Sequence, residues 1–459
     1  MTTAELLLTD GPGEVRAALV EDATVVAVRH WRNAGAVQPG AVFRARVVAV
    51  QAGKGICRLD LGQGLDAIMP DRQGRQGFSE GQMVTVQIAA LPGTQDPDKK
   101  PVARRRLALE GRSVTVETGR RVTVSPRFDA DEASAAALMS ALDEVGGRVR
   151  VTVEPAAALA DPAAVADEAR ALGGLLLTLA ADDSAPGLLL EAPGPIHAAL
   201  TAMAPAGGAL VHVDGRRLTG QVRAALDQMP AAGLSVQPWR DRDPLFSAFG
   251  VEDAIEAALA PEVDLPGGGS LGIDQTRGGA VIDVNQRGRD GASLETNRLS
   301  LNQAAARWAA HQIRLQDLAG QIFIDFVDLK RAQDWDKVLA TLDAALARDP
   351  RPSRRHQVKA AGLVVVNRQR RGPSLRDQLL APCVARLSVE SEALALAAQS
   401  VREAGSDPQP GPLVIHAPAP VAEYLRTAPG LLDDVTERTG RPVTVETGNP
   451  VRIDVGGNR

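Results

Sequence analysis

The sequence is poor in aromatic residues and has no excess of positive charge. Only 3% of its 459 residues are Phe, Trp or Tyr, which leaves few side chains on which nucleic-acid bases could stack. The formal net charge is −5, so no general basic field surrounds the chain. Any contact with an anionic polymer must therefore use local basic patches, and such binding should be sensitive to salt.

Cysteine and long apolar runs are also scarce. Cys57 and Cys383 are the only cysteines and lie far apart in the sequence, which argues against a disulfide framework and against a self-contained zinc site. No uninterrupted apolar run is long enough to span a membrane, which takes about 18 residues, and the N-terminus lacks the apolar core of a signal peptide. We therefore expect a soluble, cytoplasmic protein with no membrane contact.

Two apolar, strand-like runs each carry an acid. Residues 281–285 contain Asp283, and residues 322–328 contain Asp325 and Asp328. A helical pattern from Leu299 to Leu318 separates the two runs, so a strand, helix and strand should bring Asp283 and Asp325 onto one sheet. Mg²⁺ uses one or two carboxylates and keeps several waters, which suits such a pair.

A plainer interpretation of the same acids stays open. Each aspartate could instead cap a turn or pair with a nearby arginine, Arg314 or Arg287. Asp328 could support the metal site indirectly or be an ordinary solvated strand end.

Six sequence strings between Leu265 and Lys330 occur in a recognisable order. They read LPGGG, IDQTRGG, IDVN, ETNRLSLNQAA, RLQDLAG and IDFVDL. This stretch resembles the catalytic core of the ribonuclease E/G family, whose pattern runs LPSGG, IDQTEA, VDIN, ETALNTNLEAA, RLRDLGG and IDFIDM. The resemblance implies that Asp283 and Asp325 bind Mg²⁺ and that Asn285 orients one of their carboxylates. It also implies hydrolysis of single-stranded RNA to 5′-phosphate and 3′-hydroxyl ends.

Arginines near this core match, or could supplement, the RNA contacts of the family. Arg368 and Arg370 match the two arginines of the family's E-M-T-R-x-R string, and Arg287 and Arg289 lie in the loop after Asn285. By resemblance these side chains would bind phosphates of the RNA. For Arg368 and Arg370 the alternative is a basic strand end that faces solvent.

The N-terminal part resembles the oligonucleotide-binding barrel of the family. Its two aromatic stackers are replaced here by Arg58 and Ile68, so we expect weakened base stacking. A basic cluster follows, and strand alternation would put Arg104 and Arg106 on one face that could contact RNA. The alternative is a solvated strand edge.

Several departures from the family pattern limit the expected activity. Arg277 replaces a glutamate, and Glu154 lies where the family's 5′-phosphate pocket has an R-T-A string, so we expect no 5′-phosphate sensing. By resemblance, the catalytic domain would be followed by a zinc-link element, a Cys-Pro-x-Cys string with which two chains share a zinc ion. Here that element keeps only Cys383, so we expect no zinc ion shared between two chains. Cys383 would be a buried apolar residue or, alternatively, an intersubunit link, and a homodimer would have to form without shared zinc.

The resulting expectation is an α/β multidomain protein. Between the barrel and residue 185 we expect a helix at 132–145, a strand at 149–153, a helix at 162–172 and a strand at 174–179. We also expect a hairpin at 15–28 and, after a Pro/Gly-rich stretch at 406–412, a strand at 413–416, helices at 421–428 and 431–440, and strands at 443–446 and 451–455. By resemblance the chain would contain an RNase H-like subdomain with an inserted OB-type β-barrel, a DNase I-like α/β catalytic domain and a small C-terminal α+β domain. The expected ranges are 1–34 and 186–250 for the RNase H-like subdomain, 35–112 for the barrel, 113–185 for a degenerate 5′-sensor-like region, 251–378 for the catalytic domain, 379–388 for a degenerate zinc-link segment and 389–459 for the small domain.

Two functions remain open at this point. One is an active Mg²⁺-dependent endoribonuclease in RNA processing or decay, favoured by the retained aspartates and arginines. The other is a catalytically weak RNA-binding or regulatory relative, favoured by the departures described above.

Overall fold

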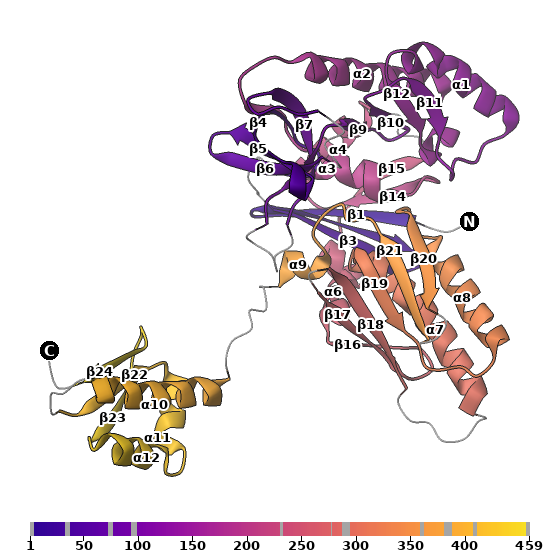
Figure 1. Cartoon of the computed structure of the whole chain (residues 1–459). Coiled ribbons are helices and arrows are strands. Elements are labelled where there is room, and N and C mark those ends of the chain that lie inside the picture. The colour runs from indigo at the N-terminus through magenta and orange to yellow at the C-terminus, as the bar shows by residue number, and fades with distance from the viewer. Residues whose placement is uncertain are drawn as a thin grey trace. The chain divides into compact units, whose positions relative to one another are not determined.

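The computed structural model of the chain is a mixed α/β structure with several sheets and one closed barrel (Figure 1). It describes residues 4–32, 37–71, 77–92, 99–229, 233–276, 278–286, 294–358, 362–380, 388–406 and 411–455. The chain divides into two compact units, residues 1–382 and 383–459. Four residues singled out above lie outside the described ranges: Arg277, Arg287, Arg289 and Cys383. Within those ranges, no helix is long and apolar enough to cross a membrane.

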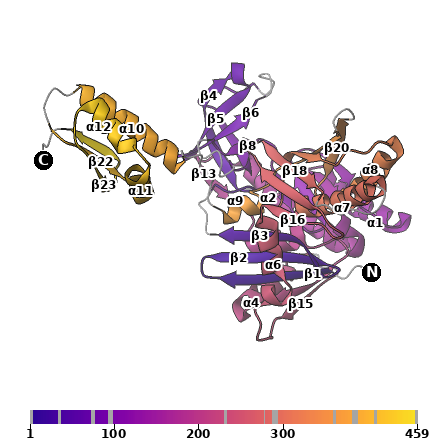
Figure 2. The ribbon, with the colours of Figure 1, turned by 90° about the horizontal axis from the view of Figure 1, so that it is seen from below.

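The first sheet of the larger unit has five strands. In spatial order they are β15 (Leu234–Pro238), β14 (Ala209–Val213), β1 (Ala4–Gly11), β2 (Glu14–Glu21) and β3 (Thr24–Arg32). Figure 2 shows β1, β2 and β3 side by side. The sheet is covered on both faces by apolar residues of short helices, which are α3 (Pro195–Ala198), α4 (Arg216–Leu226), α5 (Leu245–Ala248) and α6 (Val251–Leu259). The chain leaves this sheet after β3 and returns to it at β14.

The intervening segment begins with the barrel. Its strands are β4 (Val42–Gln51), β5 (Ile56–Gly62), β6 (Leu65–Pro70), β8 (Val102–Arg104) and β7 (Met83–Ala90), and pairing of β7 with β4 closes the ring. A further strand, β13 (Gly187–Leu190), pairs with β4 from outside the ring. The predicted small OB-type barrel is therefore confirmed.

A four-stranded sheet with two helices follows the barrel. Its elements are β9 (Ala108–Glu110), β10 (Val114–Glu117), β11 (Arg121–Val124), β12 (Arg150–Val153), α1 (Glu132–Gly146) and α2 (Pro162–Ala181). The strand predicted at residues 174–179 is wrong, because α2 continues through it. Leu176 and Leu179 are both buried, and their spacing of three residues places them on one helical face.

The second large sheet carries the aspartates of interest. Its order is β16 (Glu262–Asp264), β17 (Ser270–Gln275), β18 (Gly279–Asn285), β19 (Gly320–Asp325), β21 (Leu363–Arg368) and β20 (Ser353–Val358). The predicted helix between the two aspartates is α7 (Leu294–Leu315), and α8 (Ala332–Leu346) packs beside it. Apolar residues of both helices bury one face of the sheet (Figure 1). A short helix, α9 (Leu375–Leu379), follows β21.

The smaller unit is a three-stranded sheet with three helices. Its elements are α10 (Val389–Ser406), β22 (Leu413–Ala417), α11 (Ala419–Thr427), α12 (Leu431–Thr439), β23 (Val443–Thr447) and β24 (Arg452–Val455). β22 lies between the other strands, parallel to β23 and antiparallel to β24. This arrangement confirms the predicted order of strand, two helices and two strands.

Candidate active site

The sheet of β16 to β21 has one covered face and one open face. On the covered face Ile282, Ile324 and Val366 are buried against α7 and α8. Since successive side chains of a strand point to opposite faces, their neighbours in sequence lie on the open face. Those neighbours include Asp283, Asp325 and Asn367, which are all exposed.

Asp283 and Asp325 are direct partners across the parallel pair β18–β19. Neighbouring strands lie about 4.8 Å apart, and paired residues point to the same side of the sheet. Both side chains are exposed on the open face. The structure therefore brings the two predicted carboxylates side by side, near enough to share one cation.

Asn285 lies on the same face as Asp283, two residues farther along β18. Gly272 of β17 is the cross-strand partner of Asp283. A Cβ atom added to Gly272 would lie 3.7 Å from Asn285 Nδ2 and 3.9 Å from Asp283 Cβ. The side chains of Asp283 and Asn285 thus both lie next to this glycine, on the same face of the sheet.

The donor set fits a hard divalent cation. Mg²⁺ needs only one or two carboxylates, with waters completing its octahedron, and two adjacent exposed aspartates supply them. Among the described residues no cluster of three or more His, Cys, Asp or Glu side chains could hold a metal ion. A protein site made wholly of such ligands is therefore not found there, whereas a two-carboxylate site is compatible with the geometry.

Phe323 is an aromatic residue next to the candidate site that the sequence reasoning missed. It lies on the open face of β19, two residues before Asp325, and is half-buried beside its partner Val281, which is 38% exposed. The signal was present, because Ile322 and Ile324 point inward and strand alternation then places Phe323 outward. An aromatic ring beside two carboxylates can stack on a planar group.

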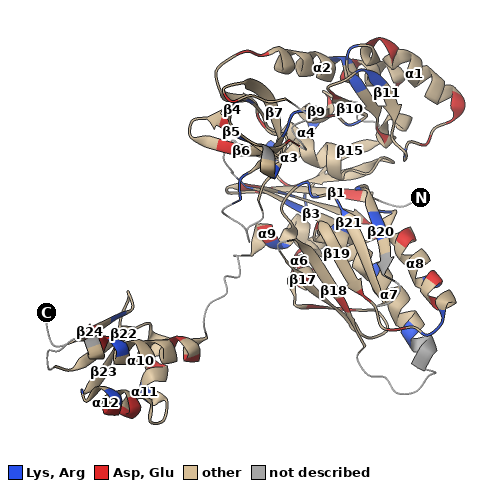
Figure 3. Cartoon of the chain, viewed as in Figure 1, with Lys and Arg blue, Asp and Glu red and all other residues tan. Residues whose placement is uncertain are grey.

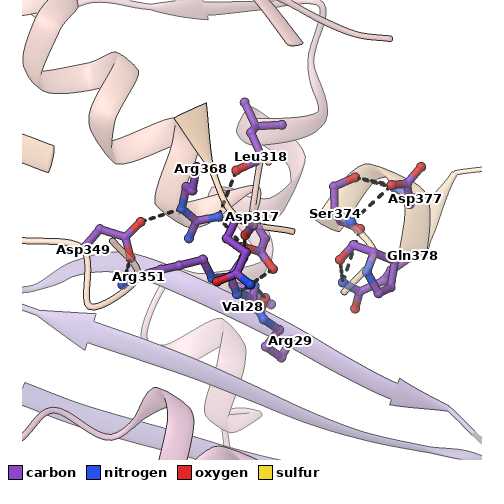
Figure 4. A network of polar contacts seen from close by, with 12 residues as sticks. Val28, Arg29, Asp317, Leu318, Asp349, Arg351, Arg368, Ser374, Asp377 and Gln378 are labelled. Atoms are coloured by element: carbon purple, nitrogen blue, oxygen red, sulfur yellow. Dashed lines mark hydrogen bonds and ion pairs between the residues drawn. The ribbon is translucent and has the colours of Figure 1, made fainter. Parts of the chain in front are cut away.

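Arg368 does not reach the open face. It is only 4% exposed, and its Nε donates to Asp349 Oδ2 at 2.7 Å while its Nη1 donates to Asp317 Oδ1 at 2.5 Å and to the Leu318 carbonyl at 2.9 Å (Figure 4). The prediction that Arg368 contacts phosphate needs correction for this reason. Alternation explains the outcome, since Arg368 shares the inward face of β21 with Val366.

Asp317 is the centre of this buried network. Besides Arg368 it binds Arg351 at 2.5 Å and Arg29 of β3 at 2.8 Å (Figure 4). Burial by itself raises the pKa of the Asp317 carboxyl, but the three arginines outweigh burial and hold that pKa below its ordinary value. The network joins the first sheet to the start of β19 and the end of β21, so it ties the two large sheets together.

Arg370 lies just beyond β21 and remains available. It lines a pocket of about 640 Å³ together with Gln321, Arg354 and Asn367, and Arg368 also borders this pocket although its guanidinium is bound to Asp317 and Asp349. This pocket is at the beginning of β19, whereas Asp325 ends that strand, a separation of about 13 Å at 3.3 Å per residue. The open face therefore has an acidic end and a basic end.

The two substituted stacker positions of the barrel face each other. Arg58 of β5 is exposed and is the cross-strand partner of Ile68 of β6, which is half-buried. Both point outward, because Cys57, Leu59 and Ala67 fill the barrel core. The outer surface of β5 and β6 thus offers one cation and one aliphatic side chain where the family pattern has aromatic rings.

Arg104 and Arg106 do not share a strand face, so that part of the prediction is wrong. β8 ends at Arg104, and Arg106 follows in a bend. Arg104 is half-buried and donates twice to Gln87 Oε1, at 2.8 and 3.2 Å. Arg106 is exposed, with its Nη1 3.9 Å from Glu117 Oε2.

Glu154 follows β12 and is half-buried. Thr115 donates its hydroxyl to Glu154 Oε1 at 2.7 Å. Burial raises the pKa of Glu154, the nearby Glu110 adds to the rise, and the Thr115 hydrogen bond and Arg371 reduce it. An acid of this kind repels a phosphate whenever it is ionised.

Comparison with known proteins agrees with the motif evidence. A model of the ribonuclease E/G family matches residues 108–371, which is more than half of the chain. The chain belongs to the ribonuclease E/G family. The family match includes Asp283, Asn285, Asp325, Arg368 and Arg370.

Individual members of the ribonuclease E/G family align over most of the chain or over part of it. Ribonuclease G of Haemophilus influenzae is 27% identical over 410 residues, which is 83% of this chain and 83% of that protein. Ribonuclease G of Escherichia coli is 26% identical over 408 residues with the same coverage. Ribonuclease E of a Nostoc species is 37% identical, but over 147 residues that cover 32% of this chain and 21% of that protein.

Proposed function

We propose that this protein is a Mg²⁺-dependent endoribonuclease that hydrolyses single-stranded RNA in RNA processing or decay, leaving 5′-phosphate and 3′-hydroxyl ends. The observation that carries the proposal is the pairing of Asp283 with Asp325 on the open face of the sheet. Membership of the ribonuclease E/G family and the similarity to ribonuclease G over 83% of the chain support it.

In this proposal Asp283 and Asp325 hold the metal, and Asn285 fixes the orientation of the Asp283 carboxylate. When bound there, Mg²⁺ would polarise a phosphodiester oxygen and lower the pKa of a coordinated water. Both carboxylates are exposed and can therefore contact an RNA strand. Asp283 lies between the buried Ile282 and Val284, and Asp325 lies between the buried Ile324 and Phe326. These buried neighbours keep the two carboxylates aligned.

Other side chains of the open face would position the RNA. The Phe323 ring can stack on a base next to the cleaved bond, a contact typically worth about 1–3 kcal/mol. Arg370 and Arg354, at the basic end of the face, can bind a neighbouring phosphate. Arg368 acts indirectly, by holding β21 through Asp317 and Asp349.

The sheets support an assignment of subdomains. We assign the five-stranded sheet to the RNase H-like subdomain, because the barrel and the sheet of β9–β12 are inserted between β3 and β14. The six-stranded sheet with α7 and α8 is assigned to the DNase I-like catalytic domain, and β9–β12 to a 5′-sensor-like region. A homodimer of this chain would form without a shared zinc ion, since two chains together offer one Cys383 each where four thiolates are needed.

A cleavage assay tests the proposal. A single-stranded oligoribonucleotide that carries a fluorophore is incubated with Mg²⁺ and the wild-type protein, or with Asp283→Asn or Asp325→Asn. We expect each substitution to lower the cleavage rate at least 100-fold, because one carboxylate alone holds the cation poorly. Asp336→Asn is the matched control, since it removes one exposed carboxylate from α8, on the covered side of the sheet.

The assay also separates this proposal from its alternative. Wild-type protein that binds the RNA but cleaves no substrate would favour a catalytically weak RNA-binding or regulatory relative. That alternative has specific support in the positions of Arg58 and Ile68, where no aromatic ring is available for stacking. Equal loss of activity in Asp336→Asn and in the two site variants would also contradict the assignment.

A further inference from the structure

A second basic pocket lies on another side of the barrel. It has a volume of about 650 Å³ and is bounded by β4, β7, the bend after β8 and the end of α2. Its polar lining residues are Arg44, Gln82, Thr85, Arg105, Arg106 and Thr118. Lys and Arg are otherwise spread over the whole chain (Figure 3), so three arginines around one hollow are a local concentration of positive charge.

Each of these arginines is held in place by a different neighbour. Arg44 Nη1 donates to Thr85 Oγ1 at 3.2 Å across the β4–β7 pair. The guanidinium of Arg105 lies over the ring of the buried Phe78, 5.7 Å from its centroid. Arg106 is steadied by Glu117, whose Oε2 is 3.9 Å from Arg106 Nη1. The three cations are therefore directed to the pocket from separate supports.

Positive charge in the pocket is incompletely balanced by the protein. No Asp or Glu is among the described residues that line it. Arg44 Nε is buried and has no hydrogen-bond partner among the described residues. The nearby acid Asp182 is half-buried and accepts hydrogen bonds from Ser184, which, together with a smaller effect of Arg44, lower its pKa. Of the three guanidinium groups, Arg106 has the carboxylate of Glu117 at 3.9 Å, and no ion pair of Arg44 or Arg105 is found among the described residues. Guanidinium groups with so little counter-charge, together with threonine hydroxyls, form a typical site for a phosphate.

We propose that this pocket binds a backbone phosphodiester of the RNA substrate outside the segment that is cleaved. The inference rests on the proposed function, in that the anion is taken to be RNA. Because the whole chain is negative, with a formal net charge of −5, RNA must be held at local sites of this kind. A phosphate contact fixes the path of the strand without reading its sequence.

The pocket is separate from the contacts already described. β7 pairs with neither β5 nor β6, so the outward residue Thr85 belongs to a different side of the barrel from Arg58 and Ile68. None of the residues that line the pocket belongs to the sheet of β16 to β21, which carries Asp283 and Asp325. A short RNA that occupies only the active site should therefore leave the pocket empty, and a longer RNA should fill it.

The test measures binding rather than cleavage. Fluorescent oligoribonucleotides of about 6 and about 30 nucleotides are titrated with protein in EDTA at several salt concentrations. Arg105→Gln combined with Arg106→Gln should weaken binding of the long RNA roughly fivefold to tenfold. It should also reduce the salt slope, which is the slope of log binding constant against log salt concentration, by about 0.7, the value for one lost phosphate contact on a single strand. Binding of the short RNA should not change.

Control variants make the result decisive. Arg223→Gln removes an exposed arginine from α4 and should leave both RNAs bound as before. The lysine variants Arg105→Lys and Arg106→Lys should restore most of the salt slope, and equal melting temperatures exclude a folding defect. If the double glutamine variant had the same salt slope for the long RNA as Arg223→Gln, the proposal would be overturned. It would also be overturned if inorganic phosphate bound in the pocket without weakening binding of the long RNA. Because no cleavage is needed, loss of catalysis and loss of this contact remain distinguishable.

Discussion

At the scale of single residues, strand alternation decides which side chains can do chemistry. Asp283 and Asp325 were predictable because each interrupts an apolar run at an outward position. Arg368 was misassigned because its motif was given more weight than the inward positions of Val364 and Val366 on the same strand. The partners of Arg368, Asp317 and Asp349, are distant in sequence, so no local pattern could reveal the buried network.

Glu154 allows a residue-scale prediction about pH. Its folded-state pKa is raised, chiefly by burial, so its contribution to stability is fully present below the ordinary glutamate pKa of about 4.3 and is lost as the pH rises through the folded value. Glu154→Gln keeps an oxygen that accepts from Thr115 and removes the charge. We expect the variant to melt at a higher temperature than the wild type at pH 7.5, with little difference at pH 4.

Thermal melts of both proteins at the two pH values check this expectation. An equal difference at both pH values would show that Glu154 is not the group responsible.

Oligoribonucleotides with a 5′-monophosphate or a 5′-hydroxyl should be cleaved at similar rates by the wild type, since an ionised Glu154 disfavours a phosphate nearby.

At the scale of elements, segments with a clear helical or strand period were predictable, and apolar segments without a clear period were not. The hairpin of β2 and β3, the helix α7 and the order of the small unit follow the sequence pattern closely. The C-terminal half of α2 was predicted as a strand, because its run of leucines after Gly173 and Gly174 carries no clear period. The strand β1 was not predicted, and its pairing with β14 joins residues about 200 positions apart.

The close approach of β18 to β19 gives an element-scale prediction. A Cβ atom on Gly279 would lie 1.7 Å from the backbone oxygen of Gln321, whereas one on Gly278 would meet nothing within 4 Å. We expect Gly279→Ala to destabilise the protein by about 1–3 kcal/mol and to reduce cleavage, because the strands that carry Asp283 and Asp325 must shift. Urea unfolding and cleavage rates are the measurements.

Gly278→Ala is the matched control for that experiment. It adds the same methyl group one residue earlier, in open space, and should leave both stability and cleavage nearly unchanged. If both variants behaved alike, the packing of β18 on β19 would not explain the alignment of the two aspartates.

The Asp317 network gives a second prediction at this scale, because it joins β3, β19 and β21. Asp317 has a positive φ of 53°, which asparagine also tolerates, so Asp317→Asn changes charge with little backbone strain. We expect a loss of about 3–5 kcal/mol at pH 7, since three arginines lose their shared carboxylate and, among the described residues, only Arg368 keeps another carboxylate partner, Asp349. The lowered pKa means that the wild type loses this stabilisation as the pH falls through the folded value, below about 3.9.

Urea denaturation of the wild type and Asp317→Asn between pH 2.5 and pH 7 tests the predicted loss of stability in acid. The difference between them should shrink in acid. A difference that stayed constant down to pH 2.5 would contradict the assigned role of the Asp317 charge.

At the scale of the whole molecule, the two units have separate cores. The core of residues 383–459 consists of apolar residues from α10, α11, α12 and the three strands of that unit, and it includes no residue of the larger unit. The sequence pattern predicted this division because a Pro/Gly-rich stretch and a complete βααββ order are both visible in it.

A fragment of residues 388–459 should therefore fold by itself. We expect a cooperative thermal transition by circular dichroism, and Leu425→Ala should lower its stability by about 2–5 kcal/mol, because Leu425 is completely buried. Exposed Glu437→Ala on α12 is the control. A fragment without a cooperative transition would show that the small unit depends on the rest of the chain.

The central claim is that Asp283 and Asp325 hold one divalent cation on the open face of the sheet. Crystals soaked in Mn²⁺ and measured at the manganese absorption edge would test it most directly. We predict one anomalous peak within about 2.0–2.2 Å of an oxygen from each carboxylate, a distance typical of small hard cations, and no peak in Asp283→Asn crystals. A peak elsewhere, or no peak in crystals of protein that cleaves RNA in the same buffer, would contradict the account.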